Sequence, residues 1–319
     1  MRLLLAALIL LSFQNSHAWG RRGHSIVATN AGYLLSEELK DDFYKSHSYD
    51  LGYYANTPDF IWKEPATYAK EAKQHYMDKE IFERGLKDYK GPDAYAMSRE
   101  DFDAKFPDIP LDAGRGFWRV REIYDLLTQT SEKLAQTELT KAERFAHQAN
   151  WLLAAGVIGH YIGDFAQPLH VTENFDGKMT NQEGIHSFFE DAVVDELYGS
   201  LEQKSLMEAK KRWKFFHQKN ASKDLLTLLK DMTNVSFSDL PELLKIDKKM
   251  GKRDLKKGVQ AYRGMIEERI TVASLYLAEI LVRQTKWTPN NDRFFSFFGR
   301  PPYIEPGKLA QLPPVTAAQ

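Results

Sequence analysis

The sequence contains no cysteine among its 319 residues. This absence excludes disulfide bonds, and it excludes zinc sites whose ligands are thiolates. Packing must therefore hold the core together, and the hydrophobic content of 43% is sufficient for a substantial core. Any metal site in this chain must use nitrogen and oxygen ligands.

An excess of charge of either sign is also absent. The formal net charge is −1, from 43 basic and 44 acidic residues. The sequence thus lacks the basic surplus that usually accompanies nucleic-acid binding. A nucleic-acid substrate is still compatible with this balance, because bound metal ions would supply local positive charge.

Long hydrophobic runs are missing except at the N-terminus. There, Arg2 precedes the apolar residues 3–11, and residues 16–18 (Ser-His-Ala) form a small-x-small cleavage motif. The apolar run is too short for a transmembrane anchor, although an uncleaved membrane segment is the alternative. The pattern predicts that residues 1–18 are a signal peptide. The mature protein would then begin at Trp19 and be secreted or periplasmic.

The sequence shows no internal repeat and no extended alternation of polar and apolar residues. Helical periodicity is present instead, so the sequence predicts an all-α fold. We expect a single multi-helix domain at 19–287, followed by an extended Pro-rich tail with an aromatic cluster at 288–319. The expected elements are helices at 117–135, 141–166, 185–198 and 256–286, one or two solvent-facing helices within 201–232, and a helix–loop connection at 240–252.

Residues 160–190 hold an unusual concentration of candidate metal ligands. His160 and Asp164 are four residues apart, so on a helix they share one face. His186 and Glu190 repeat that spacing, and His170 lies between the two pairs. Imidazole and carboxylate ligands together suit zinc better than calcium or a thiolate-preferring metal.

A structural role for such pairs is the alternative, because a histidine and a carboxylate at this spacing often form a hydrogen bond at a surface or in the core. The surrounding residues favour a buried helix: Ala154, Ala155, Val157, Ile158, Ile162 and Phe165. A buried carboxylate needs a partner or a metal ion. Two pairs and a further histidine in one stretch therefore favour a metal site.

Three earlier positions remain ambiguous from the residues alone. A terminal amine at Trp19 could chelate a metal together with its own carbonyl, and His24 could join it, but a tryptophan there could simply pack. Asp59 follows Pro58, where a helix N-cap is the commoner role. His75 could be a lone surface histidine.

The order of these residues resembles the zinc-dependent nuclease and phospholipase C superfamily. The closest similarity is to the single-strand nucleases of fungi and plants and their bacterial relatives. The opening WGRRGH is similar to the nuclease pattern WGxxGH, and HYIGDFAQPLH matches the central motif of both branches. The resemblance covers Trp19 to about Leu197, and the helix at 256–286 fits the family by position only.

The resemblance implies a helical fold with three zinc ions in one cleft. The first ion would be held by Asp59, His75, His160 and Asp164, and the second by His170, His186 and Glu190. The third would be held by the amine and carbonyl of Trp19, with His24 and Asp164. Asp164 would therefore bridge two ions.

The resemblance also implies a phosphodiesterase reaction on single-stranded DNA, RNA or nucleotides. A water molecule activated by zinc would attack phosphorus, and Asp59 would orient that water or take its proton. Tyr76 would stack on a base, a contact that suits the exposed bases of single strands. No obligate protein partner is evident in the sequence.

Two other functions remain open. A zinc-dependent phospholipase C acting on phospholipid is favoured by Glu190, where the nucleases usually carry Asp, and by the aromatic cluster at 294–298. The short spacing from Trp19 to His24 favours the nuclease, and Arg21 and Arg22 would repel a choline head group. A secreted zinc-binding protein without activity is the third hypothesis, and the catalytic role expected of Asp59 argues against it.

Overall fold

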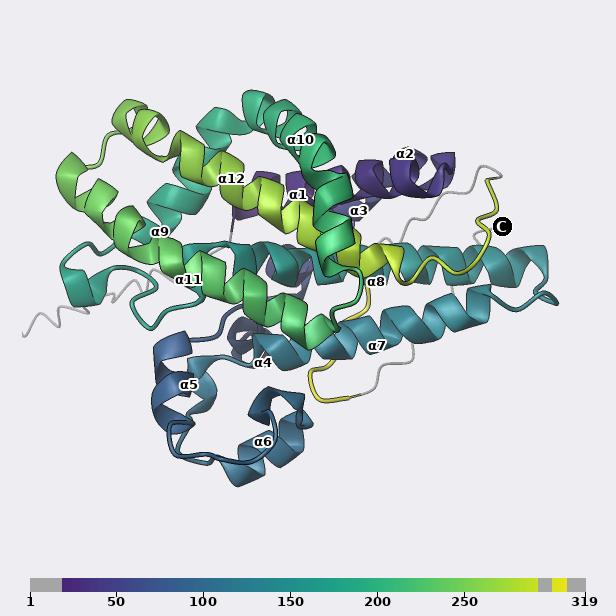
Figure 1. Ribbon diagram of the computed structural model, residues 1–319, viewed down its shortest axis with the longest axis horizontal. Helices are drawn as coiled ribbons and strands as arrows, with labels where there is room; N and C mark the ends of the chain where they lie inside the picture. The colour runs from purple at the N-terminus through teal and green to yellow at the C-terminus, as the bar shows by residue number, and fades with distance from the viewer. Residues whose placement is uncertain (1–18, 292–299, 309–319) are drawn as a thin grey trace, which may run out of the picture.

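A computed structural model describes residues 19–291 and 300–308 of the chain (Figure 1). The expected signal peptide at 1–18 lies outside the described residues. Within the described ranges, every regular element is a helix or a helical turn, and no strand occurs. The all-α prediction is therefore confirmed for this part of the chain.

The centre of the fold is α8, which spans Lys141–Ala166 as the sequence predicts. A capping box at its start joins Thr140 and Glu143. From Gln148 onward every residue of α8 is buried, because other helices cover it on all sides. The helix ends before Pro168, whose ring disfavours a helical residue in front of it. This arrangement places both residues of the first ligand pair inside the molecule.

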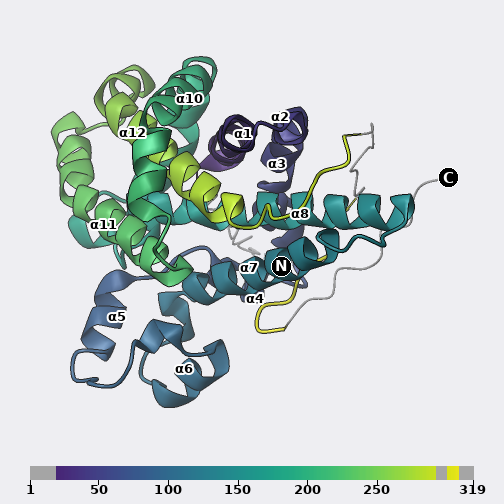
Figure 2. The ribbon, with the colours of Figure 1, turned by 45° about the vertical axis from the view of Figure 1, so that its right-hand side comes forward.

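Two sets of helices enclose α8. On one side α7 (Gly116–Leu134) runs alongside it, and on the other lie α1 (Gly20–Leu39) and α12 (Leu255–Val282), as Figures 1 and 2 show. Outer helices complete the bundle: α2 (Asp42–Ser46), α3 (Ser48–Tyr54), α10 (Val193–Asn220) and α11 (Leu225–Met250). The predicted helices at 117–135 and 256–286 are thus present with small shifts at their ends.

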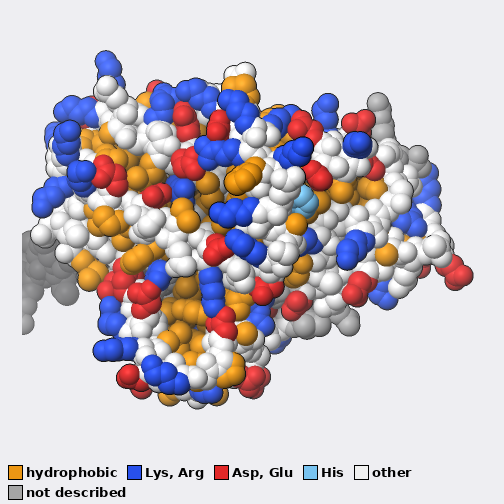
Figure 3. All heavy atoms as spheres, in the orientation of Figure 1, with side chains coloured by type: hydrophobic (Ala, Val, Ile, Leu, Met, Phe, Trp, Pro, Cys, Tyr) orange, Lys and Arg blue, Asp and Glu red, His pale blue; other side chains and the backbone are white. Residues whose placement is uncertain are grey.

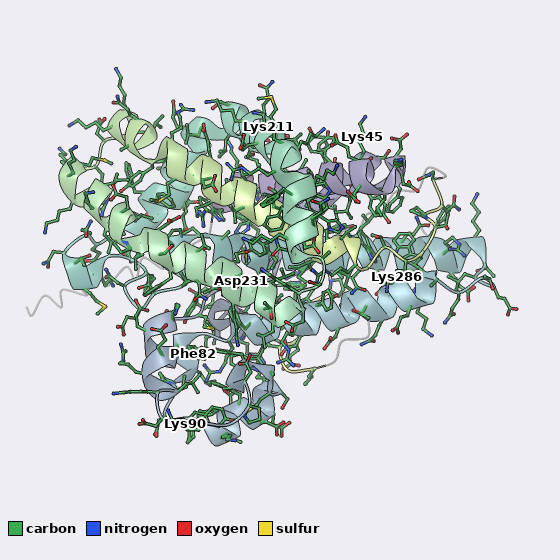
Figure 4. All side chains as sticks on the ribbon, viewed as in Figure 1. Lys45, Phe82, Lys90, Lys211, Asp231 and Lys286 are labelled. Atoms are coloured by element: carbon green, nitrogen blue, oxygen red, sulfur yellow. The ribbon has the colours of Figure 1, made fainter. Side chains whose placement is uncertain are left out.

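A smaller lobe extends from the bundle below α4 (Tyr68–Glu71) in Figure 1. It contains α5 (Lys79–Gly85), η3 (Ala94–Ala96), α6 (Arg99–Lys105) and η4 (Leu111–Ala113). Phe82 is buried and lies inside this lobe in Figure 4. The ring centroids of Phe102 and Trp118 lie 4.4 Å apart. The lobe therefore has an aromatic core of its own, continuous with the bundle.

Two wide π-helical turns interrupt the regular helices. The first, η1, spans Pro58–Trp62, and the second, η7, spans Phe188–Ala192. The predicted helix at 185–198 is present as a continuous helical stretch, but α9 (Ile185–Ser187) leads into the π-helical turn η7 before α10 begins, and this turn was not predicted. Shorter turns complete the chain: η2 (Ala72–Gln74), η5 (Pro168–His170) and η6 (Lys178–Thr180). Each π-helical turn contains one of the predicted carboxylate ligands.

The prediction of a helix–loop connection at 240–252 is wrong. Helix α11 continues through Pro241 to Met250. Proline removes one backbone hydrogen bond from a helix, but Leu240 and Leu243 are buried beside it. The packing of these two leucines offsets the lost hydrogen bond. Helix propensity alone does not include such tertiary contacts. Helix α10 ends at Asn220 and α11 begins at Leu225, so the polar region at 201–232 is divided between two helices.

The charged surface has no dominant sign. Figure 3 shows basic and acidic side chains interspersed over the face formed by α10, α11 and α12, in agreement with the net charge of −1. Within the described residues, no helix has the length and apolar character that crossing a bilayer would require. Of the predicted tail, residues 292–299, with the whole aromatic cluster at 294–298, and 309–319 lie outside the described residues. Ile304 in the described piece is only 3% exposed.

Candidate metal centre

The predicted ligand side chains come from seven parts of the chain, α8 among them, and meet at α8. His160 and Asp164 lie on α8, while His170 ends η5. The others are contributed by α1 (His24), η1 (Asp59), the residue after η2 (His75), α9 (His186) and η7 (Glu190). All of these side chains are buried, with at most 5% of any residue exposed. The bundle thus brings together every side chain that the sequence predicts as a ligand.

The first group forms around His75 and His160. Nδ1 of His75 lies 2.9 Å from Nε2 of His160 and 3.1 Å from Oδ2 of Asp164. Oδ1 of Asp59 lies 3.6 Å from that nitrogen of His75 and 3.7 Å from Nε2 of His160. Ligand atoms about 2.0–2.1 Å from a tetrahedral zinc ion lie about 3.3 Å from one another. The four donors therefore have the spacing of one zinc site.

The second group forms around His186. Its Nε2 lies 2.7 Å from Oε2 of Glu190 and 2.9 Å from Nε2 of His170. The distance from Nε2 of His170 to Oε2 of Glu190 is 3.5 Å. These three donors could hold one further ion.

His24 connects the N-terminal helix to the first group. Its Nε2 lies 3.4 Å from Oδ1 of Asp164, and its ring stacks on His160 with 3.8 Å between ring centroids. The same Oδ1 atom lies 4.0 Å from Nδ1 of His170. The carboxylate of Asp164 therefore faces a histidine of the first group, a histidine of the second group and His24. This position fits the bridging role that the resemblance implies.

Trp19 packs against the same stretch of α8. It is fully buried, and its indole Nε1 donates a hydrogen bond of 2.7 Å to the carbonyl of Gly163. Its own carbonyl accepts the backbone N–H of Gly23 at 3.0 Å in the first turn of α1. Trp19 is thus next to His24, and ligation by its amine and carbonyl stays a prediction.

Hydrogen bonds to backbone carbonyls orient two of the imidazoles. Nδ1 of His160 lies 2.7 Å from the carbonyl of Ala55, and Nδ1 of His170 lies 2.8 Å from the carbonyl of His75. A proton on each Nδ1 leaves Nε2 as the basic nitrogen that can bind a metal. Both Nε2 atoms point into the groups described above.

Burial sets the protonation of the histidines. It lowers the pKa of His24 and of His186 to about 4, and it also lowers the pKa values of His160 and His170. These imidazoles are therefore neutral at pH 7, which is the form that binds metal. His75 differs: burial acts against its charge, but its contacts with carboxylates raise its pKa.

Burial has the opposite effect on the carboxyl groups. It raises the pKa of Glu190 to about 7 and raises that of Asp164 as well. A buried carboxylate is costly without a cation beside it. A bound metal ion would supply that charge and favour the ionised form of both groups.

Several buried donor and acceptor atoms lack a hydrogen bond among the described residues. Among them are both ring nitrogens of His24, Nε2 of His75, Oδ1 of Asp164 and Oε1 of Glu190, and others are scattered elsewhere in the molecule. Buried polar atoms without partners are rare in folded proteins, and each calls for an explanation. Because several of these atoms gather in the donor groups, the residues there fit a cluster of bound cations with nitrogen and oxygen ligands.

The donor groups border a cleft of about 250 Å³. His75, His170 and His186 form part of its wall. Tyr76, the predicted base-stacking residue, also lines it. The remaining wall includes Lys63, Tyr68, Asp78, Asp112, Glu173 and Phe175. A substrate in this cleft would contact both the aromatic side chains and the candidate metal centre.

Sequence reasoning missed the other cleft residues, among them Lys63, Asp78 and Phe175. Nζ of Lys63 lies 2.6 Å from Oδ1 of Asp59, and its spacing of four residues from Asp59 was a usable signal. Burial, with Glu80 nearby, raises the pKa of Asp78 to about 7. Phe175 is 47% exposed at the cleft, in an irregular segment where no periodic pattern could have indicated it.

Comparison with known proteins gives one clear result. The sequence model of the S1/P1 nuclease family matches residues 19–286. This range covers most of the chain and includes every predicted ligand. A search of curated proteins finds no match.

Proposed function

This chain belongs to the S1/P1 nuclease family, and we propose that it is an exported, zinc-dependent nuclease that acts on single-stranded DNA or RNA. Membership indicates a hydrolase of phosphodiester bonds with a nucleic-acid substrate. The observation that carries the proposal is the convergence of buried imidazole and carboxylate donors, several of them without hydrogen bonds, on one aromatic cleft.

Zinc is the metal that this donor set favours. The chain offers neutral imidazoles and carboxylates and has no thiolate, and the donors in each group lie at tetrahedral spacing. We propose that the first group, the second group and the His24 side of Asp164 each hold one ion. Zinc bound there would lower the pKa of water, so that water attacks phosphorus near neutral pH, and would neutralise charge on the phosphate.

Residues of η1 would support the reaction directly. The carboxylate of Asp59 faces both His75 and His160, so it could orient the attacking water or accept its proton. The Lys63 ammonium is held against Asp59 and reaches the cleft, where it would attract a phosphate oxygen. Burial alone would lower the pKa of Lys63, but the Asp59 carboxylate outweighs that effect and raises it, so this ammonium stays charged.

The aromatic wall of the cleft supports single-stranded substrates. Tyr68, Tyr76 and Phe175 line the same cavity as the ligand histidines. Aromatic side chains stack on bases that are free of their own base pairs, and such stacking contributes about 1–3 kcal/mol per base. A base within a duplex is already stacked on its neighbours and could not enter the cleft without being extracted.

The test is an assay with matched substrates. Metal-loaded protein would be incubated with denatured DNA, the same DNA as duplex, and phospholipid vesicles, each with and without a zinc chelator. We expect cleavage of denatured DNA that the chelator abolishes and zinc restores, with slower cleavage of the duplex. Chelator-resistant cleavage would exclude the zinc mechanism, and bound zinc without turnover of any substrate would support the non-catalytic hypothesis.

The phospholipase C alternative depends on Glu190, because the aromatic cluster at 294–298 that also motivated it lies outside the described residues. Chelator-sensitive vesicle hydrolysis without nuclease activity would favour that alternative.

Export is a proposal based on the N-terminal pattern alone. If residues 1–18 are removed, the amine of Trp19 becomes free beside His24, which completes the third ligand set. N-terminal sequencing of the protein recovered from its native host should then begin with Trp19. An intact Met1 in the active protein would contradict both the cleavage site and the main-chain chelate.

A further inference from the structure

The chain continues beyond residue 286, where the family match ends, and a later segment packs against the elements beside the metal centre. Residues 300–308 lie along α4 and α7, where they form the yellow loop beneath these helices in Figures 1 and 2. Ile304 is 3% exposed, and its carbonyl accepts a hydrogen bond of 2.7 Å from Nη2 of Arg119 on α7. This segment, which we call the strap, is therefore anchored in the interior.

The strap contacts the element that carries Asp59. The ring of Tyr303 meets the ring of Trp62 edge-on, with 5.6 Å between centroids and an interplanar angle of 83°. Trp62 is 1% exposed and ends η1, three residues after Asp59. The strap thus covers the buried side chain that fixes this short turn.

A buried chain of polar contacts leads from the strap to His75. Arg119 donates to Oε2 of Glu71 at 3.0 Å through the same Nη2 that donates to Ile304. Oε1 of Glu71 accepts a hydrogen bond of 2.5 Å from Tyr161 and lies 3.6 Å from Nε2 of His75. Glu71, Arg119 and Tyr161 are all fully buried.

This chain of contacts selects the nitrogen of His75 that can bind a metal. Oε2 of Glu71 lies 3.0 Å from the guanidinium of Arg119, and this ion pair holds Glu71 as an anion. An anion near Nε2 favours a proton on that nitrogen, and Nδ1 is then free to bind the metal. Nδ1 is the atom that lies 3.1 Å from Asp164 in the first group.

The elements that carry these ligands are too short to hold their own shape. η1 has five residues, α4 has four and η2 has three. Helical turns of this length form only when tertiary contacts hold them. The strap supplies such contacts through Tyr303 on Trp62 and through the Ile304 carbonyl on Arg119. Its exposed ion pairs, Arg300 with Glu64 and Glu305 with Lys70, contribute little.

We propose that residues 300–308 position Asp59 and His75 for metal binding, through Trp62 on one side and through Arg119 and Glu71 on the other. Glu71 and Arg119 are positioning residues, because neither belongs to the donor groups themselves. The inference rests on the proposed metal binding. The second group of His170, His186 and Glu190 lies one step further from the strap, because it is linked to this chain of contacts through the hydrogen bond between Nδ1 of His170 and the carbonyl of His75.

The test compares two double variants of the full chain. Tyr303→Ala/Ile304→Ala removes the side chains that pack the strap against the interior, and Arg300→Ala/Glu305→Ala removes only its exposed ion pairs. Zinc stoichiometry and affinity would be measured by titration with a competing chelator, together with the thermal unfolding of the metal-free proteins. We expect the Tyr303→Ala/Ile304→Ala variant to bind zinc at the first group about 10- to 100-fold more weakly, as is typical when a partner of a ligand is lost. The second group should lose clearly less affinity than the first, and the ion-pair variant should stay within about threefold of wild type at every site.

Selectivity separates positioning from general stability. An equal loss of affinity at all sites, matched by a fall in the unfolding temperature of the metal-free protein, would overturn the proposal, as would an unchanged first group. Wild-type protein that binds no zinc would instead overturn the proposed function itself, and the role of the strap with it.

Glu71→Gln gives a second measurement. It keeps the size of the side chain but removes the negative charge near His75, so it should weaken the same site selectively. If the strap acts through Glu71, combining this change with Tyr303→Ala/Ile304→Ala should cost less than the product of the separate losses. Fully multiplicative losses would contradict a shared route to His75.

Discussion

The two groups of candidate ligands differ in how they are assembled. His170, His186 and Glu190 lie within 21 residues of one another, on the short elements η5, α9 and η7. The first group joins Asp59 and His75 to α8, and the contact between His75 and His160 spans 85 positions. The second group is thus a local arrangement, while the first exists only in the complete bundle. Damage to distant parts of the fold should therefore affect the first group more.

The largest expected effect comes from the residue that the first group shares with its neighbours. Asp164→Asn should reduce cleavage of denatured DNA by about 10²–10³-fold or more, the scale of losing a principal charge-stabilising group. Its two oxygens face His24, His75 and His170, so more than one ion should be affected. Metal content per protein and initial cleavage rates would be measured together.

Glu190→Gln is the informative counterpart, because it should remove one ion and leave the first group loaded. Asp195→Asn, an exposed change on α10, is the control and should alter neither quantity. A variant Asp164→Asn with full metal content would contradict the bridging role.

The second comparison concerns pH. Because the pKa of Glu190 is raised to about 7 without metal, a proton competes with the ion as the pH falls below that value. Zinc affinity at the second group should drop about tenfold per pH unit between pH 7 and 5. The pKa of His186 is about 4, so its proton should add to the slope only near that pH.

Chelator competition at several pH values would measure this slope. In Glu190→Gln the affinity should be lower at pH 8, but its decline between pH 7 and 5 should be flatter than in wild type. Parallel slopes in the two proteins would show that Glu190 is not the competing group.

A smaller effect should follow from filling the space beside His24. A Cβ atom on Gly163 would lie 2.8 Å from Nδ1 of His24, closer than real side chains approach. Gly163→Ala should destabilise the protein by about 1–3 kcal/mol through overpacking, measured by urea unfolding. Gly199→Ala is the matched control, since its Cβ would meet nothing within 4 Å and alanine favours a helix. Equal stability of the two variants would mean that His24 has room to move.

The smallest effect should come from the far end of α8. Thr140→Ala removes the capping box and should cost about 1 kcal/mol of stability. Zinc affinity should not change in either group, because the cap lies about five turns of α8 from His160. A change in metal affinity would show that the position of the whole helix, rather than local contacts, controls the centre.

The difference between the two groups also explains what the sequence could predict. Spacing alone identified the pairs on α8 and at 186–190, because residues four apart meet without knowledge of the fold. His24, Asp59 and His75 stayed ambiguous from the residues alone. Only the resemblance to known nucleases joined them to α8, and the bundle confirms that they meet there.

Other features were hidden because they arise from tertiary packing. The turn at η7 was predicted as a plain helix, since its sequence has ordinary helical periodicity. The buried Glu71 and Arg119 gave no signal, because charged residues are normally assigned to the surface. The boundaries of α7 and α8 were predicted closely, because strong helical periodicity coincides there with clear caps or breaks in the sequence.

The two π-helical turns have a consequence for how this chain can change over time. Each residue of a helix rotates the following ones by about 100°. Losing one residue within 188–192 would turn either Glu190 away from His186 or the buried residues Val193 and Leu197 away from the core. The same holds for Asp59 and Trp62 in the other turn. In the evolution of this sequence, substitutions within these turns should therefore be tolerated more often than deletions of a single residue, which should be removed by selection.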